Sequence, residues 1–124
     1  MKVKEIMQSA FIVEKDVSLN DAAKIMSDKG IGSLLVVFNK KLKGIVTEKD
    51  LMRNFGKDKK ISEIMTKNVI TIEPNENIET ALSIMMDKKI KRLPVTKNDS
   101  LIGIISIPDI AAHADEVAED FLIE

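Results

Sequence analysis

The spacing of apolar residues along this chain changes in a fixed order, and that order occurs twice. Short runs of β-branched and aromatic residues at 11–13 and 69–72 predict strands. Each run leads into apolar residues at helical spacing behind a capping side chain, Ser18 or Asn77. A helix is therefore expected after each of these strands.

Each predicted helix is followed by two more apolar runs with a polar turn between them. Residues 34–38 and 42–46 flank the first turn, and residues 93–96 and 101–105 flank the second, so each pair predicts a hairpin. A second helix is expected directly after each hairpin. The predicted unit is β-α-β-β-α, and the chain contains two of them.

The two units are copies of one another. Sliding the sequence by 59 residues aligns 10–52 with 69–111 without a gap, and 14 of those 43 pairs are identical. The tripeptide EIM precedes each aligned block, so each repeat begins near it. We predict an α+β fold of two β-α-β-β-α repeats, residues 1–56 and residues 57–124, the second with a C-terminal helical tail. Because one repeat has few apolar positions, the copies are expected to pack with pseudo-twofold symmetry as one bilobed domain.

Composition and charge restrict the classes of function. The 124 residues carry a formal net charge of −1, so the basic surface of a nucleic-acid binder is not expected. The absence of cysteine excludes disulfides and thiolate metal sites, and no apolar run approaches the roughly 20 residues that span a bilayer. We expect a cytoplasmic protein with neither a nucleic acid nor a membrane as its partner.

The sequence contains no recognisable catalytic or metal-binding motif. The single histidine, His113, lies on a predicted terminal helix beside alanines, without a cysteine or an elbow serine to pair with. Neither a phosphate-binding GxxxxGK nor the acidic spacing of an EF-hand occurs. We predict no catalytic residue and no metal site; an enzyme such as a nucleotide hydrolase would need a base or a metal that the sequence does not supply.

The two hairpins end in matching motifs, G-I-V-T-E-K-D and G-I-I-S-I-P-D. Thr47 with Asp50, and Ser106 with Asp109, have the spacing of a capping box, in which both side chains satisfy amides of the first helical turn. The same hydroxyl and carboxylate at a helix start also suit an anion and a ribose diol. Capping and ligand binding are two open interpretations of these side chains.

Basic residues accompany this motif in the second repeat only. Lys91 and Arg92 immediately precede the strand that contains Pro94, and the planar fork of arginine suits phosphate oxygens. The first-repeat counterparts are Gly32 and Ser33. The second repeat is therefore expected to bind phosphate better, unless its two cations are ordinary surface residues.

A separate apolar pattern predicts a surface for a protein partner. It lies on the second helix of the first repeat and on the tail, where exposed apolar residues at helical spacing usually mark a contact. Its members are Met52, Val117, Phe121 and Leu122.

These motifs, in this order, resemble the cystathionine-β-synthase (CBS) domain. The resemblance rests on two copies of EIM, a strand, a helix, a strand near LPV and the hydroxyl-x-x-Asp helix start, and it covers nearly the whole chain as a tandem pair. It implies clefts between the sheets that bind AMP, ADP, ATP or another adenosyl compound such as S-adenosylmethionine. It also implies a homodimer formed through the helices.

The resemblance further implies which residues bind the ligand. Thr47 and Ser106 correspond to the hydroxyl that meets phosphate or ribose, and Asp50 and Asp109 to the carboxylate that binds ribose. The remaining implied positions are Ile12 and Thr71 beside adenine, Lys91 and Arg92 at phosphate, Ser33 as their uncharged counterpart, and Pro94 of the LPV strand, where the first repeat has Leu35.

We interpret the sequence as a regulatory module and not an enzyme. It is expected to need no cofactor, to bind an adenine nucleotide or S-adenosylmethionine as a regulatory ligand, and to transmit occupancy to an effector protein. The alternative is a ligand-free dimerisation or scaffold module with the same fold.

Overall fold

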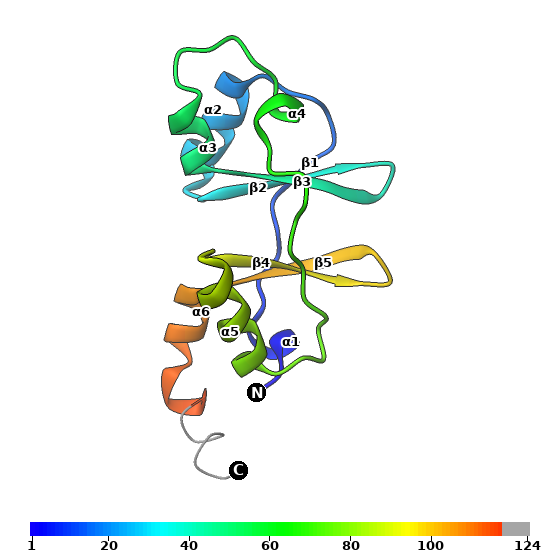
Figure 1. Cartoon of the computed structure of the whole chain (residues 1–124), viewed down its shortest axis with the longest axis vertical. Coiled ribbons are helices and arrows are strands. Elements are labelled where there is room, and N and C mark those ends of the chain that lie inside the picture. Colours follow the sequence, from blue (N-terminus) through cyan, green and yellow to red (C-terminus); the bar gives the residue numbers. More distant parts are fainter. Residues whose placement is uncertain (118–124) are drawn as a thin grey trace. The chain divides into compact units, whose positions relative to one another are not determined.

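The computed structural model describes residues 1–117 and divides the chain into two compact units (Figure 1). The central unit comprises Ala10–Val69. The split unit combines Met1–Ser9 with the chain from Ile70 onward. The α+β class with two repeats is confirmed; the central unit contains every element of the β-α-β-β-α order, and in the split unit the first strand is reduced to one bridge.

The central unit is a three-stranded sheet with helices on one face (Figure 1). Its strands are β1 (Ile12–Val13), β2 (Ser33–Phe38) and β3 (Lys41–Thr47), with β1 parallel and β3 antiparallel to β2. Its helices are α2 (Leu19–Lys29), α3 (Glu48–Arg53) and α4 (Ile61–Ile64). The buried core draws on α2, β2, β3 and α4, and its members are Leu19, Ala22, Met26, Leu34, Val36, Val46, Ile61 and Ile64.

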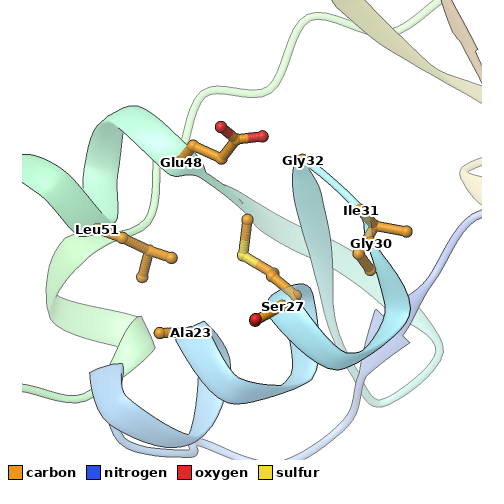
Figure 2. A pocket seen from close by; sticks show the side chains of 8 residues that line it. Ala23, Ser27, Gly30, Ile31, Gly32, Glu48 and Leu51 are labelled. Carbon is orange, nitrogen blue, oxygen red and sulfur yellow. The ribbon is translucent and has the colours of Figure 1, made fainter.

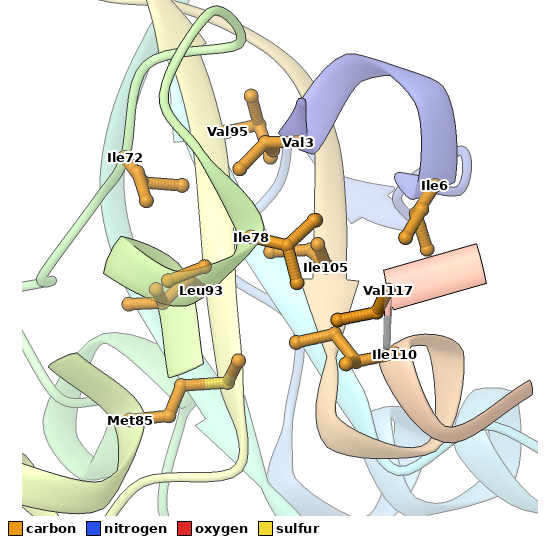
Figure 3. Packing of buried hydrophobic residues seen from close by; sticks show 11 residues of the cluster. Val3, Ile6, Ile72, Ile78, Met85, Leu93, Val95, Ile105, Ile110 and Val117 are labelled. Carbon is orange, nitrogen blue, oxygen red and sulfur yellow. The ribbon is translucent and has the colours of Figure 1, made fainter. Parts of the chain in front are cut away.

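The split unit repeats this layout on a two-stranded sheet. It contains α1 (Val3–Ile6), α5 (Ile78–Lys88), the antiparallel strands β4 (Arg92–Lys97) and β5 (Ser100–Ser106), and α6 (Ile107–Ala112). Figure 3 shows how α1, α5 and α6 place apolar side chains against β4 and β5. The core members are Val3, Ile6, Ile72, Ile78, Ala81, Met85, Leu93, Val95, Ile105, Ile110 and Val117.

A proline explains why the split unit has one strand fewer. In the central unit the amide of Leu35 donates to the carbonyl of Phe11 at 3.0 Å, which ties β1 to β2. The equivalent residue in β4 is Pro94, which has no amide proton to donate. The strand predicted at 69–72 therefore shortens to a single bridge between Ile72 and Val95.

The compact units cut across the sequence repeats because the two short helices are exchanged. Helix α1 begins the first repeat but packs in the split unit, and α4 begins the second repeat but packs in the central unit. At the start of α4, Ser62 donates its hydroxyl (2.7 Å) and its amide (3.0 Å) to the carboxylate of Asp16. These two hydrogen bonds lower the pKa of Asp16 below its usual value.

The predicted helix caps are only partly as expected. The hydroxyl of Ser18 accepts a hydrogen bond from the amide of Asp21 at 3.0 Å and caps α2 as predicted. Asn77 occupies the cap position of α5, but its side chain makes no cap bond. Its amide oxygen instead accepts from the ammonium of Lys2 at 3.0 Å. The prediction of a side-chain cap was wrong at Asn77 because α1 brings a competing donor to it.

The two long helices end differently at equivalent positions. Helix α2 ends at Gly30 in the left-handed conformation (φ 63°), and α5 ends at Lys89 with nearly the same backbone (φ 56°). A side chain with a Cβ is strained in this conformation, whereas glycine is not.

We expect Lys89→Gly to raise the free energy of unfolding by about 1 kcal/mol because it relieves this strain. The matched control is Lys88→Gly, one residue earlier in helical conformation, which is expected to lower it by about 0.5–1 kcal/mol. Urea denaturation followed by far-UV circular dichroism measures both. Equal signs for the two variants would contradict the assignment of strain to Lys89.

The predicted partner surface is corrected in part. Met52 is 78% exposed, as expected, but Val117 is 8% exposed and belongs to the core of the split unit. The amide of Val117 donates to the carbonyl of His113, which turns its side chain inward after α6. Phe121 and Leu122 lie outside the described residues. Within residues 1–117, no helix is long and apolar enough to cross a membrane.

Candidate functional site

In the central unit, the end of β3 and the start of β2 meet at the beginning of α3. Ser33 pairs directly with Thr47 in the β2–β3 register, and the amide of Glu48 donates to the carbonyl of Gly32 at 3.3 Å. Oδ2 of Asp50 accepts from the amide of Thr47 at 2.8 Å and from its hydroxyl at 3.1 Å. Three of the predicted site residues, Ser33, Thr47 and Asp50, therefore lie together.

The split unit builds the same arrangement at the start of α6. Arg92 pairs with Ser106 in the β4–β5 register, and the amide of Ile107 donates to the carbonyl of Lys91 at 3.1 Å. Oδ2 of Asp109 accepts from the amide (3.0 Å) and the hydroxyl (2.8 Å) of Ser106. The amide of Asp109 donates back to Oγ of Ser106 at 3.3 Å, which completes the predicted capping box.

The two aspartates use only one of their carboxylate oxygens for capping. Among the described residues, Oδ1 of Asp50 and Oδ1 of Asp109 accept no hydrogen bond. Asp50 is nevertheless only 9% exposed. Because neighbouring residues surround its side chain and Oδ2 is bonded to Thr47, the orientation of the free Oδ1 is fixed. A carboxylate with a free, fixed oxygen can accept from a hydroxyl donor such as a sugar diol. Capping and ligand binding are compatible at both helix starts.

In the central unit, the residue expected beside adenine lies on β1, which pairs with the strand that begins at Ser33. Ile12 is 43% exposed and pairs with Leu35 on β2, the strand that begins at Ser33. Its neighbour Phe11 is 44% exposed, and the ammonium of Lys29 lies 5.3 Å from the ring centroid. The exposed ring of Phe11 thus lies directly before Ile12 in the chain, a neighbour that the sequence analysis did not include among the site residues.

In the split unit the corresponding segment is held by Pro94. The amide of Ile72 donates to the carbonyl of Pro94 at 3.0 Å, and Thr71 is the exposed residue just before it. Pro94 is itself buried in β4. The backbone carbonyl of Pro94 thus anchors the segment that carries Thr71.

The charges around the two helix starts differ. Lys91 is exposed and Arg92 is half-buried, and neither forms an ion pair with another described residue. The central unit has Gly32 and Ser33 at these places. It has Glu48 at the first position of α3, where α6 has Ile107. The split unit is therefore more favourable to a phosphate than the central unit.

A pocket of about 380 Å³ opens between α2 and α3 of the central unit (Figure 2). The sequence analysis did not predict this pocket, because several of the residues that line it are small and their spacing follows no periodic pattern. Its lining residues are Ala23, Met26, Ser27, Gly30, Ile31, Gly32, Glu48 and Leu51. Within residues 1–117, no group of three or more histidine, cysteine, aspartate or glutamate side chains could hold a metal ion.

The sequence model of the CBS domain matches residues 3–57 and 61–116. The chain belongs to the CBS domain family. The two matches are tandem repeats, as the internal alignment predicted.

Solved structures and curated proteins agree with this assignment. The CBS domain pair of protein MJ0100, crystallised with 5′-methylthioadenosine and S-adenosyl-L-methionine, is 30% identical with a TM-score of 0.86, over 94% of this chain and 97% of that one. An inosine-5′-monophosphate dehydrogenase of Nitrosopumilus maritimus is 36% identical over 112 residues, 89% of this chain. A homoserine O-acetyltransferase of Methanohalobium evestigatum is 38% identical over 107 residues, 84% of this chain.

The CBS pair is a small part of those two enzymes. This chain spans 23% of the length of the dehydrogenase and 22% of the length of the acetyltransferase. The likeness to them therefore concerns the CBS pair.

Proposed function

We propose that this CBS pair is a regulatory module that binds an adenine nucleotide or another adenosyl compound and transmits its occupancy to a partner protein. One observation carries the proposal. The same hydroxyl–aspartate pair stands at the helix start of both units, with Oδ1 of Asp50 and Oδ1 of Asp109 left free. The presence of 5′-methylthioadenosine and S-adenosyl-L-methionine in the MJ0100 structure supports the adenosyl class of ligand.

The ligand is held by residues of the same type in each unit. Asp50 and Asp109 bind the ribose hydroxyls through Oδ1, while Thr47 and Ser106 offer their hydroxyl groups. Ile12 and Thr71 flank the base, with Phe11 adding apolar surface in the central unit. Lys91 and Arg92 bind phosphate in the split unit, where the central unit has only Ser33, so AMP, ADP or ATP prefers the split unit.

Transmission uses the helices that begin at the ligand residues. Asp50 lies in the first turn of α3, and Met52 lies in the same helix with 78% of its surface exposed. Phe55, just after the helix, is 88% exposed, and Met86 on α5 is 69% exposed. A contiguous patch of exposed apolar side chains marks a protein contact, and Met52 and Phe55 lie only three residues apart in the central unit. We assign this contact to a homodimer, whose helix packing shifts when the ligand binds, and an effector protein reads that shift.

We expect the purified wild-type protein to bind AMP, ADP, ATP or S-adenosylmethionine in a calorimetric titration. Arg92→Ala and Asp109→Asn are each expected to weaken AMP binding about 10- to 100-fold, because each removes one charge-assisted hydrogen bond. S-adenosylmethionine carries no phosphate, so Arg92→Ala is expected to affect it less than Asp109→Asn does.

Ser18→Ala is the matched control, since it removes a helix cap at α2 without touching either helix start. It should leave every dissociation constant unchanged. If none of the four ligands binds up to millimolar concentration, the alternative of a ligand-free scaffold replaces the regulatory proposal. In that case Asp50 and Asp109 serve only as caps.

A further inference from the structure

The central unit and the split unit carry opposite net charges. Residues 10–69 contain 12 lysine and arginine residues against 8 aspartate and glutamate residues, a net charge of +4, and the rest of the chain carries −5. Several lysines of the central unit lie at the turn of the β2–β3 hairpin and in the segment beside β3. These exposed residues, which we call the lysine edge, are Lys40, Lys41, Lys43 and Lys67. The net charge of −1 for the whole chain therefore averages over a locally positive surface.

The fold brings the four lysines together. Thr66 and Ile45 exchange two backbone hydrogen bonds of 2.9 and 3.0 Å in an antiparallel bridge, so Lys67 lies beside β3. The register between β2 and β3 passes over Lys43, which forms a β-bulge. Figure 1 shows the tip of this hairpin extending beyond the helices of its own unit. None of the four ammonium groups forms an ion pair or a hydrogen bond with another described side chain.

The backbone beside these lysines is open on one side. Strand β3 is an edge strand, because the order of its sheet is β1-β2-β3. Beyond the hairpin itself, the backbone of β3 bonds to the backbone of another described residue only at Ile45. The outer side of residues 41–44 is therefore free to pair with a further strand. Residues 38–47 contain no aspartate or glutamate that would offset the lysines.

Lysines on an edge strand also protect a protein against aggregation, and the split unit shows whether this chain requires such protection. Strand β5 is an edge strand as well, in the order β4-β5. At the positions equivalent to the three hairpin lysines it has Asp99, Ser100 and Ile102, and Ile102 is 41% exposed. Because this edge has no lysine, protection against aggregation does not account for the lysine edge.

The backbone of the turn also disfavours one of the lysines. Lys40 has a left-handed conformation (φ 65°) at a turn position that favours glycine. The equivalent residue is Asp99 (φ 66°), and aspartate tolerates this conformation better than lysine does. A residue kept in an unfavourable conformation indicates a use for its side chain, which at Lys40 is the positive charge.

We infer that the lysine edge binds an extended acidic segment of a partner protein, which adds to the sheet as a further strand beside β3. Backbone hydrogen bonds hold the segment along residues 41–44, and its carboxylates meet the four ammonium groups. A single-stranded nucleic acid would need exposed aromatic side chains for its bases, but Phe38, the one aromatic residue of the hairpin, packs against the core of the central unit. The inference goes beyond the regulatory function proposed above, because it needs no adenosyl ligand.

Fluorescence anisotropy with a labelled decapeptide of alternating glutamate and valine tests the inference. We expect binding that weakens about tenfold when the salt concentration rises from about 50 mM to about 300 mM. The control decapeptide alternates glutamate and proline, so it carries the same charge but lacks half of the amide protons of a strand. We expect the control to bind about tenfold more weakly. Equal binding of the two peptides, or no binding of the glutamate–valine peptide, would overturn strand addition.

Charge reversal locates the contact. Lys41→Glu combined with Lys43→Glu is expected to weaken binding of the glutamate–valine peptide about tenfold or more. The matched control combines Lys24→Glu with Lys57→Glu, which reverses two exposed lysines elsewhere in the same unit and changes the net charge equally. It should leave the dissociation constant unchanged, and far-UV circular dichroism checks that both double variants fold. An equal loss in the two double variants would overturn the assignment to the lysine edge.

Amide hydrogen exchange of the wild-type protein provides a readout that needs no variant. Addition of the glutamate–valine peptide should raise protection in β3 and leave β5 unchanged. No rise in β3 would overturn the inference, as would tighter binding of poly(U) RNA than of the peptide, which would assign the lysine edge to nucleic acid. A protein that binds the peptide but no adenosyl ligand contradicts only the regulatory proposal. A protein that binds AMP but not the peptide contradicts only the acidic-segment inference.

Discussion

We expect Ile61→Ala to lower the free energy of unfolding by about 3 kcal/mol, because it removes a large side chain that has no exposed surface. Ile61 lies in the second sequence repeat, yet it packs into the core of the central unit with residues of α2, β2 and β3. Its amide also donates to the carbonyl of Val17 at 3.0 Å, which joins α4 to that unit. The largest loss of order should therefore occur in the central unit.

Urea denaturation measures the overall loss, and amide hydrogen exchange locates it. In Ile61→Ala, protection should fall more in β2 and β3 than in β4 and β5. The control is Ile102→Ala on β5, where the side chain is 41% exposed, and the expected loss is below about 1 kcal/mol. Greater loss of protection in β4 and β5 would contradict the packing of α4 in the central unit.

The sequence predicted the main strands and helices because their residues carry periodic signals. Alternation and β-branched runs located β2 to β5, and helical spacing behind Ser18 located α2. The helices α1 and α4 have only four residues each, which is too short for a period to be visible. Their exchange between units also depends on contacts far apart in the chain, such as Ser62 with Asp16.

The candidate site was predictable in its residues but not in its detail. The spacing from Thr47 to Asp50 identified the helix start. It could not show that Oδ2 of Asp50 accepts both capping hydrogen bonds while Oδ1 accepts none from the described residues. The effect of Pro94 on the neighbouring strand follows from its missing amide, but the bond that it removes becomes visible only when Leu35 is seen bonded to Phe11. The pocket between α2 and α3 is open because several of its lining residues have small side chains or none. Small residues at these positions produce no periodic pattern that sequence analysis could detect.

The second large effect is expected from Gly103→Ala, which should destabilise the split unit by about 2 kcal/mol. A Cβ at Gly103 would lie 2.9 Å from the carbonyl oxygen of Gln8 and 3.0 Å from Sδ of Met7. The carbonyl cannot withdraw freely, because Gln8 and Ile104 exchange two backbone hydrogen bonds of 2.8 and 2.9 Å. The new methyl group must therefore displace the segment that follows α1 or break those bonds.

Combining Gly103→Ala with Met7→Ala separates the two contacts. The double variant removes the sulfur atom but keeps the backbone oxygen of Gln8, so it should remain at least as unstable as Gly103→Ala in urea denaturation. Recovery of wild-type stability in the double variant would show that the flexible side chain, and not the backbone, requires glycine. Wild-type stability in Gly103→Ala would contradict the close approach altogether.

The central unit should respond in the same way, because it contains the same crossing. A Cβ at Gly44 would lie 2.9 Å from the carbonyl oxygen of Thr66, and Thr66 exchanges two backbone hydrogen bonds with Ile45. In the split unit, Gly103 on β5 faces the segment that follows α1. In the central unit, Gly44 on β3 faces the segment that follows α4. If Gly44→Ala lowers hydrogen-exchange protection mainly in β2 and β3, and Gly103→Ala mainly in β4 and β5, each glycine permits the attachment of one exchanged helix. Uniform loss across the chain in both variants would contradict that division.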